Sequence, residues 1–273
     1  MSILKVDLIS GFTTDLVTID GRVSEGYQTT ASGTYSHAEG FGTTTNNLYS
    51  HAEGQFTITN GTASHAEGGY TTASGSFSHT EGELTTASGD SSHAEGNGAK
   101  AQGASSHAEG KDTLAIGWYS HAEGQFTITN GTASHAEGSS TTASSEASHA
   151  EGQFTKALGQ GSHAEGYNTT ASGDFSHAEN YATKATGAYS HAGGYQSTVN
   201  GFGSFIHSQN SIVTADRCVV LGGENITGST VDTVYVPKLE VAETNQGIIM
   251  KSPDGTRYKV TVANGGTISI TLA

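Results

Sequence analysis

Histidine recurs in this chain at a fixed spacing of 14 residues. Twelve of the 13 histidines in the 273-residue sequence follow this period from His37 to His191, with no insertion or deletion. Each stands in a Ser-His-Ala-Glu-Gly motif or a near copy, and the stretch 51–68 recurs unchanged at 121–138. Helical repeat units need 30 or more residues, whereas two short strands and two tight turns fit into 14.

The repeat predicts an all-β fold dominated by a parallel β-solenoid (a β-roll) of 14-residue turns. Each turn would stack on the previous one through backbone hydrogen bonds, at about 4.8 Å per layer. The register extends past the histidines, because Val23 lies one period before the first of them, and Phe205 and Val219 lie one and two periods after the last. We therefore expect about 15 turns over residues 23–222.

The composition takes on a different meaning beside this repeat. Leu, Ile, Val and Phe supply only 45 of the 273 residues, and 11 basic against 26 acidic residues give a net charge of -15. In an ordinary chain these values indicate disorder and disfavour an enzyme with one large core. In a narrow coil, Ser, Ala, Thr and Gly can fill the interior, so few large apolar side chains are needed.

The same data argue against several classes of protein. The acidic balance argues against nucleic acid as a partner. No stretch of 18 apolar residues exists, so we expect no membrane insertion. Cys218 is the single cysteine and cannot form a disulfide within the chain. The N-terminal sequence lacks the layout of a signal peptide, so we expect no export by that route.

Variation between the repeats indicates which side chains face inward. Counted from each histidine, the residue eight earlier is almost always Thr, six earlier is Ala or Thr, and four earlier is mostly Gly. The residues one before, one after and three after are nearly always Ser, Ala and Gly. Alternation along a strand puts each set on one face, so we expect both sets inside the coil. The positions seven and five earlier vary freely and are expected to face solvent.

The His and Glu columns lie on the opposite face, yet they barely vary. An outward column without variation needs a repeated partner, and the simplest one is the same face of another copy, in parallel and in register. Stacked carboxylates would repel by about 1 kcal/mol per neighbour, which the histidines could relieve by donating hydrogen bonds or taking protons. The predicted oligomer-interface ladder comprises Glu25, His37, Glu39, His51, Glu53, His65, Glu67, His79, Glu81, His93, Glu95, His107, Glu109, His121, Glu123, His135, Glu137, His149, Glu151, His163, Glu165, His177, Glu179 and His191, and its apolar cap comprises Val23, Phe205, Val219 and Leu221.

The segment Ala73-Ser-Gly-Ser-Phe-Ser-His-Thr-Glu-Gly82 resembles the head repeat of trimeric autotransporter adhesins of the YadA type. That family has 14-residue turns in a left-handed parallel β-roll with three chains side by side, so the resemblance implies a homotrimer. Its motif commonly reads Ser-Val-Ala-Ile-Gly, which this chain approaches only at Cys218-Val-Val-Leu-Gly222. Elsewhere His and Glu replace the residues that the family uses for apolar packing between chains.

The Ser-His-Ala-Glu-Gly arrays and the segment 247–262 resemble bacteriophage tail and virion fibre proteins. This resemblance implies a non-enzymatic structural fibre on the surface of the phage particle, which displays or attaches to a host-surface receptor. Its expected partners are further copies of itself, other virion proteins and a host-surface glycan. The alternatives are the head domain of a bacterial adhesin at the cell surface, and a fibre-borne polysaccharide depolymerase or autoproteolytic chaperone.

The ladder also suggests two kinds of chemistry. Zinc sites need three or four ligands that converge from different places, so a one-column His-x-Glu ladder is interpreted as structural, with no metal and no cofactor. Ser36 faces away from His37 under strand alternation, which disfavours a Ser-His-Glu triad, and we expect no catalytic residue. Cys218 and His207 could suggest a nucleophile, but a buried thiol in the cap is the favoured interpretation.

Two further columns allow more than one interpretation. The Thr column resembles the threonine arrays of ice-binding solenoids, although an inward ladder with hydrogen-bonded hydroxyls is favoured. The variable aromatic residues two positions before His are expected to face outward. Packing over the turns or against a neighbouring chain is favoured for them over stacking on sugars. They are Tyr35, Tyr49, Phe77, Tyr119, Phe175 and Tyr189.

The large apolar residues are concentrated at the two ends. Residues 1–22, which include Leu4, Val6, Leu8 and Ile9, are predicted to cap the first coil or to attach to a larger particle. Residues 223–273 are predicted to form a small antiparallel β domain, which threefold association would stabilise through a shared core. Its expected strands cover 231–239, 248–251, 257–262 and 267–272, with a turn at 252–255.

Overall fold

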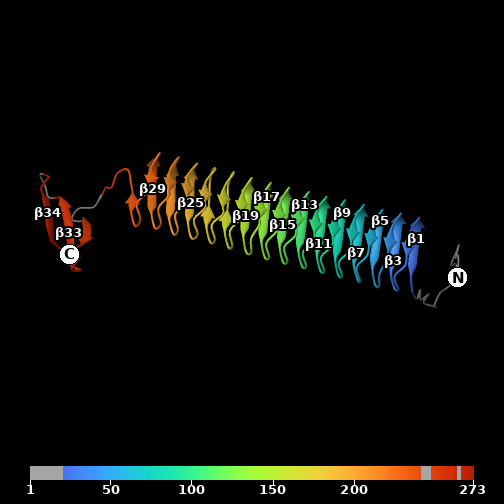
Figure 1. Ribbon diagram of the computed structural model, residues 1–273. Helices are drawn as coiled ribbons and strands as arrows, with labels where there is room; N and C mark the ends of the chain where they lie inside the picture. Colours follow the sequence, from blue (N-terminus) through green and yellow to red (C-terminus); the bar gives the residue numbers. More distant parts are fainter. Residues whose placement is uncertain (1–20, 241–246, 263–265) are drawn as a thin grey trace, which may run out of the picture.

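The computed structural model describes residues 21–240, 247–262 and 266–273, so most of the expected N-terminal segment lies outside the described residues. Stacked coils form a straight rod, and each coil contributes one strand to each of two parallel sheets (Figure 1). The coils follow the predicted step of 14 residues, since Val23 pairs with His37 and His37 pairs with His51. The predicted all-β parallel β-solenoid is confirmed.

The two long sheets contain 16 and 15 strands. Within the described residues, no helix has the length and apolar character needed to cross a membrane. The first sheet contains β1 (Val23–Tyr27), β3 (His37–Phe41), β5 (His51–Gln55), β7 (His65–Gly69), β9 (His79–Glu83), β11 (His93–Asn97), β13 (His107–Lys111), β15 (His121–Gln125), β17 (His135–Ser139), β19 (His149–Gln153), β21 (His163–Ala164), β23 (His177–Ala178), β25 (His191–Tyr195), β27 (Phe205–Gln209), β29 (Val219–Glu224) and β31 (Val234–Tyr235). The second sheet contains β2 (Thr30–Ala31), β4 (Thr44–Thr45), β6 (Ile58–Thr59), β8 (Thr72–Ala73), β10 (Thr86–Ala87), β12 (Lys100–Ala101), β14 (Leu114–Ala115), β16 (Ile128–Thr129), β18 (Thr142–Ala143), β20 (Lys156–Ala157), β22 (Thr170–Ala171), β24 (Lys184–Ala185), β26 (Thr198–Val199), β28 (Ile212–Val213) and β30 (Thr227–Gly228).

Each coil turns at residues with a left-handed backbone. Tyr35 and Tyr49, two positions before a histidine, both have φ of 58°, and Phe56, five positions after one, has φ of 54°. A single left-handed residue costs about 1–2 kcal/mol when it is not glycine. Hydrogen bonds between coils offset this strain, as between the His37 amide and the Ser50 carbonyl at 3.0 Å.

Small side chains fill the interior of the central coils. Ala38, Thr43 and Thr45 have no exposed surface, and Ser36 is almost fully buried. The Ser36 hydroxyl donates to the carbonyl of Gly33 at 2.6 Å, which explains why Ser recurs at this column. The inward placement of these columns is confirmed, and the variable columns are partly or largely exposed as expected.

The threonine column agrees only in part with its expectation. Its burial excludes it as an ice-binding surface, because the hydroxyls do not face solvent. The expected hydrogen bonds exist at a few positions, such as from Thr71 to the Glu67 carbonyl at 3.3 Å and from Thr129 to Ser120 at 3.0 Å. Ten buried threonine hydroxyls have no partner, so the expectation is wrong for them. Around them the Ser hydroxyls already donate to carbonyls of their own turn.

The glycine three residues after each histidine does not lie inside the coil. Gly110 has φ of 104°, which ends the strand alternation and turns this column outward. A Cβ atom on Gly110 would stand 2.2 Å from the carbonyl oxygen of Gly124 in the next coil. The column is therefore glycine because the backbone is left-handed there and the next coil approaches closely.

The rod continues beyond residue 222. Val234 in β31 pairs in parallel with Val219 in β29, after a shift of register in β29 that makes this last step 15 residues long. The segment 231–239 was expected as a strand of the antiparallel domain, which is wrong. Val234 instead prolongs the column that begins with Val23, so the segment adds one more coil to the roll.

The remaining C-terminal strands form the predicted antiparallel sheet. β32 (Ile248–Lys251), β33 (Arg257–Val262) and β34 (Ile268–Leu272) pair in that order, with a turn closed by the Gly255 amide and the Ser252 carbonyl at 2.9 Å. One face of this sheet carries only large side chains, because apolar residues and Tyr258 alternate with polar ones along β33 and β34. Ile270 and Leu272 on this face are 64% and 75% exposed.

Candidate functional site

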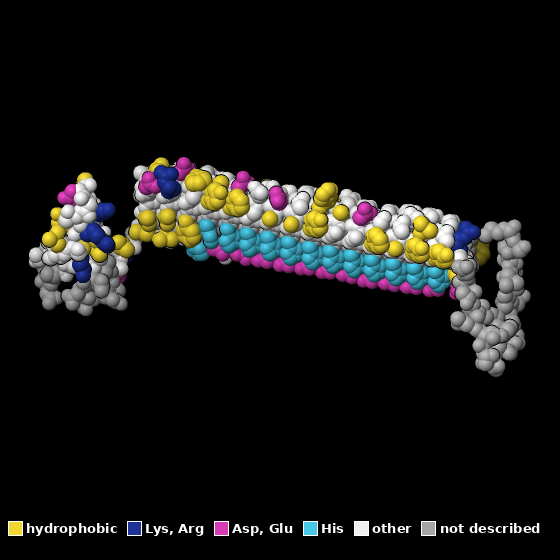
Figure 2. Space-filling view, turned by 90° about the horizontal axis from the view of Figure 1, so that it is seen from below, with side chains coloured by type: hydrophobic (Ala, Val, Ile, Leu, Met, Phe, Trp, Pro, Cys, Tyr) yellow, Lys and Arg dark blue, Asp and Glu magenta, His cyan; other side chains and the backbone are white. Residues whose placement is uncertain are grey.

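The histidines and glutamates form two adjacent rows along one side of the rod (Figure 2). Histidine is the first residue of each long strand and glutamate the third, with a buried alanine or threonine between them. From His37 to His177 the successive imidazole rings lie 4.7–5.0 Å apart, with 1–12° between their planes. The outward ladder predicted from the sequence is confirmed, while its role as an oligomer interface stays a prediction.

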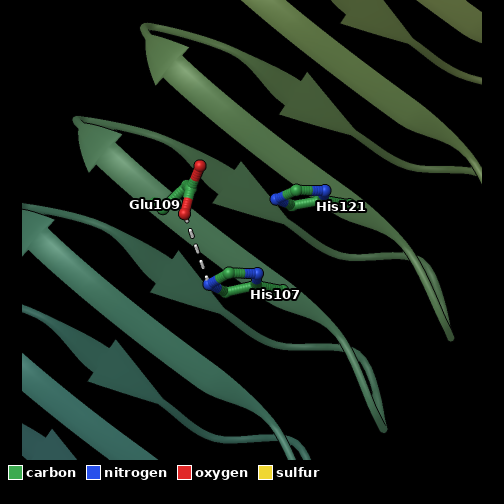
Figure 3. Close-up of side chains that lie close together, drawn as sticks. All are labelled: His107, Glu109 and His121. Carbon is green, nitrogen blue, oxygen red and sulfur yellow. Dashed lines mark ion pairs between the residues drawn. The ribbon is translucent and has the colours of Figure 1, made fainter.

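Each histidine stands between two carboxylates. The Nε2 atom of His107 lies 3.6 Å from Oε1 of Glu95 in the preceding coil and 3.8 Å from Oε2 of Glu109 in its own coil. Figure 3 shows the Glu109 carboxylate beside the ring of His107, with the ring of His121 stacked above. His37, in the first coil of the ladder, has the same arrangement with Glu25 and Glu39.

Each carboxylate therefore bridges two coils. Oε2 of Glu151 faces His149 in the same coil at 4.0 Å, and Oε1 faces His163 in the next coil at 3.8 Å. The side chains are about one-third exposed. Sequence reasoning placed His and Glu in separate columns and missed this sharing between coils, because it depends on the side-chain rotamers.

Most of the histidine nitrogens in these contacts lack a hydrogen-bond partner. Distances of 3.6–4.0 Å are too long for a hydrogen bond. Hydrogen bonds form only near the C-terminal end of the ladder, from His177 to Glu165 at 3.1 Å and from His191 to Glu179 at 3.2 Å, so the predicted His–Glu bonding within the chain is confirmed there. Ten buried Nε2 atoms have no partner: those of His37, His51, His65, His79, His93, His107, His121, His135, His149 and His163.

The carboxyl groups share protons along their own row. Hydrogen bonds with the neighbouring carboxyls raise the pKa of Glu67, Glu123 and Glu151 to about 7. The same bonds hold the pKa of their neighbours below the ordinary value, as at Glu53 and Glu109. Some carboxyls of the row thus carry a proton near neutral pH and donate it to an ionised neighbour, which reduces repulsion in the row.

The histidines themselves are held neutral. Desolvation is the first cause that lowers the pKa of His65, His93 and His121, and the stacked neighbouring imidazoles add to it. The same direction holds for His149, His163 and His191. Of the two forms of relief expected from the sequence, hydrogen bonding occurs at the end of the ladder, and uptake of protons by these histidines is disfavoured. The protons reside on the glutamates instead.

An open groove of about 1060 Å³ follows the glutamate row. It is lined by ladder carboxylates and by the outward glycines, from Glu25 to Gly124. Because glycine has no side chain, the groove keeps the same cross-section from coil to coil. The recurrence of Glu-Gly in the sequence is the signal of this groove, although we expected the glycine inside.

The apolar cap residues continue the two columns. Val23, Phe205 and Val219 are half-buried and stand in the histidine column, and Leu221 is 45% exposed and pairs with His207 in the glutamate column. Their contact with another chain stays a prediction.

Two sequence features that suggested catalysis are buried elsewhere. Cys218 has no exposed surface, and desolvation raises the pKa of its thiol, as expected for a buried thiol and not for a nucleophile. Ser106 is 2% exposed and its hydroxyl donates to the Gly103 carbonyl at 2.7 Å, away from the ladder face. The described residues therefore bring no Ser-His-Glu triad together at this coil.

Two segments of the chain, residues 101–120 and 150–176, match the YadA head domain repeat. Both lie within the ladder region of the rod, and the parallel solenoid around them agrees with a YadA-like β-roll. The resemblance seen in the sequence is therefore supported by the repeat match and by the architecture. A search of curated proteins finds no match to the chain.

Proposed function

We propose that this protein is a non-enzymatic structural fibre of a bacteriophage virion, in which three copies form a β-roll rod that displays or attaches to a host-surface receptor. The observation that carries the proposal is the straight stack of coils with two matches to the YadA head repeat, because YadA head domains are surface-exposed parts of adhesins. The phage context is supported by the resemblance of the Ser-His-Ala-Glu-Gly arrays and of segment 247–262 to virion fibre proteins.

The ladder supports association with further copies. Its side chains vary little although they are about one-third exposed, and ten buried imidazole nitrogens lack a partner. The groove beside the glutamate row repeats with the period of the coils. A partner that meets every coil in the same way must share that period, and a parallel copy of the chain does so.

The C-terminal sheet supports the same conclusion by a different route. A three-stranded sheet with one bare apolar face is marginally stable in water. Ile248, Met250, Ile268, Ile270 and Leu272 on this face are each between 47% and 75% exposed. Three such faces, turned toward one axis, would form a shared core.

Mass in solution tests the assembly. A trimer of 27.9 kDa chains has a mass of 83.7 kDa (3 × 27.9). We expect multi-angle light scattering to give this value at all concentrations at which the protein is stable. A monomer in the same measurement would contradict the interface role of the ladder.

Exposed aromatic residues are the proposed receptor-binding groups. Trp118 and Tyr119 are adjacent on a turn and are 63% and 67% exposed, and such rings suit stacking on sugars. The double substitution Trp118→Ala/Tyr119→Ala should weaken adsorption to the host surface and leave the melting temperature unchanged. The matched change Phe175→Ala/Tyr189→Ala removes an exposed, stacked pair elsewhere on the rod and tests whether the effect is local.

The adhesin head of a bacterial surface is the second candidate, and the YadA repeat match favours it equally. Immunogold labelling with an antibody against the protein distinguishes the two, since a fibre is labelled on phage particles and an adhesin on cells. For the enzyme alternatives, a capsular polysaccharide that is shortened on incubation, or a second, shorter protein band on a gel, would contradict the non-enzymatic proposal.

A further inference from the structure

The ladder brings together ligand atoms that are distant in the sequence. At each complete coil, the Nε2 atom of His meets Oε1 of the preceding coil's glutamate and Oε2 of its own coil's glutamate. For Glu25, His37 and Glu39, all three atoms lie within 4.8 Å of one another. The objection raised from the sequence, that ligands in one column do not converge, is thus removed by the sharing of carboxylates between coils.

The separations leave room for a metal ion between the side chains. Around His107 the two N···O distances are 3.6 and 3.8 Å, too long for hydrogen bonds. Two ligands that each lie about 2.1 Å from a zinc ion are about 3.6 Å apart when the angle at the ion is near 120°. Small side-chain rotations are therefore enough to close the coordination.

The unpartnered nitrogens are a second and independent observation. The Nε2 atoms of ten ladder histidines are buried and have no hydrogen-bond partner, although each is directed toward carboxylate oxygens. A buried polar atom without a partner is costly. At His177 and His191, where Nε2 lies within 3.2 Å of a carboxylate, this deficiency is absent.

We propose that the ladder binds a row of divalent transition-metal ions, each held by one imidazole nitrogen and by carboxylate oxygens from two successive coils. Eleven histidines, from His37 to His177, stand between two ladder glutamates and so offer this set of ligands. A mixed set of nitrogen and oxygen ligands suits zinc, whereas calcium and magnesium prefer oxygen alone. The remaining coordination positions are open to water or to another copy of the chain. All three ligands belong to one chain, so the inference does not depend on the proposed function.

Zinc binding to the full-length protein tests the proposal. The protein is freed of metal with a chelator and dialysed against zinc chloride, and a second sample is refolded with zinc because assembly could cover the ladder. Elemental analysis should find several zinc ions per chain, up to eleven, and far less calcium under the same conditions. The melting temperature should rise with zinc, because an ion that binds only the folded state stabilises it.

Two glutamate variants locate the ions. The Glu109 carboxylate is shared by the coils of His107 and His121, so Glu109→Gln should lose up to two zinc ions per chain. Glu146→Gln makes the same change of charge at an exposed residue outside the ladder and should lose none. Should Glu109→Gln fail to fold by circular dichroism, His107→Gln replaces it and should lose one ion. Zinc uptake that is absent, or that is equal in the ladder variant and in Glu146→Gln, would overturn the proposal.

Discussion

The central coils and the last coils of the rod share one backbone path but are held together by different side chains. In the centre, buried Ala, Thr and Ser fill the interior, and His and Glu form the outer rows. In the last coils Val199, Ile206 and Val213 are fully buried, and Phe205 and Val219 occupy the histidine column. The coil shape is thus set by its turns and its backbone ladder, and the column chemistry can change from polar to apolar without altering the sheet order.

The two regions also differ in how strictly they keep their period. The central coils contain no insertion over twelve histidines, whereas the last coils include a 15-residue step and a shift of register between β27 and β29. Contacts between identical neighbours leave no room for an extra residue in the centre. At the end, Gly222 has open space around its α-carbon, so the chain can bulge there.

The largest expected effect separates the two regions at the same column. Gly110→Ala in the centre would place Cβ 2.2 Å from the Gly124 carbonyl oxygen at φ of 104°, so two coils must move apart. We expect a loss of about 3 kcal/mol or more in the apparent free energy of unfolding. Gly222→Ala, with φ of 69° and no atom within 4 Å, should lose only about 1–2 kcal/mol. Urea unfolding followed by circular dichroism measures both, and equal losses would show that the close approach of the coils does not matter.

A smaller effect is expected when a central coil is given the column residues of the last coils. His107→Val removes the ring that separates the Glu95 and Glu109 carboxylates from apolar neighbours, and should lower the free energy of unfolding by about 1 kcal/mol in metal-free buffer. The double variant His107→Val/Glu109→Leu copies Val219 and Leu221. It should lose less than the sum of the two single variants, because it removes the carboxylate along with its neighbour. Strictly additive losses would mean that the two columns are energetically independent.

The part of the structure that the sequence could predict is the part that repeats. Comparison of the coils with one another showed the period, the register at Val23, Phe205 and Val219, and the inward Ser and Ala columns, because each coil is an independent record of what its position tolerates. The outward turn at Gly110 was not predictable by strand alternation, since it depends on a positive φ. The last coil at Val234 was missed because a one-residue insertion hides it from a fixed period.

The candidate site was predictable as a set of residues and not as a set of contacts. The ladder residues were found by their invariance on an outward face. The sharing of Glu151 between His149 and His163 could not be found, because it depends on carboxylate rotamers and on which oxygen faces which coil. The exchange of protons within the glutamate row was missed for the same reason, and relief by charged histidines was expected in its place.

The third prediction concerns the pH dependence that only the polar region should have. Hydrogen bonds from neighbouring carboxyls raise the pKa of Glu67, Glu123 and Glu151 from 4.5 to about 7 in the folded state. Their contribution to stability is therefore fully present below pH 4.5 and is lost as the pH rises through 7. Neighbours such as Glu53, with a lowered pKa, contribute above the ordinary value and lose this contribution only at lower pH. Histidines such as His65, whose pKa lies below 6.5, destabilise the fold only as the pH falls below 6.5.

Between pH 6.5 and 8.5 the three raised carboxyls should therefore dominate, and the melting temperature of the metal-free protein should fall by a few degrees. The triple variant Glu67→Gln/Glu123→Gln/Glu151→Gln keeps neutral hydrogen-bonding groups at these positions but has no proton to lose, so its melting temperature should stay level over the same range. Glu83→Gln/Glu146→Gln removes acids outside the ladder and should retain the wild-type slope. Parallel slopes in all three proteins would place the pH dependence outside the glutamate row. A level triple variant beside a sloping wild type would assign it to shared protons, a source of stability that the apolar column of Phe205 and Val219 does not have.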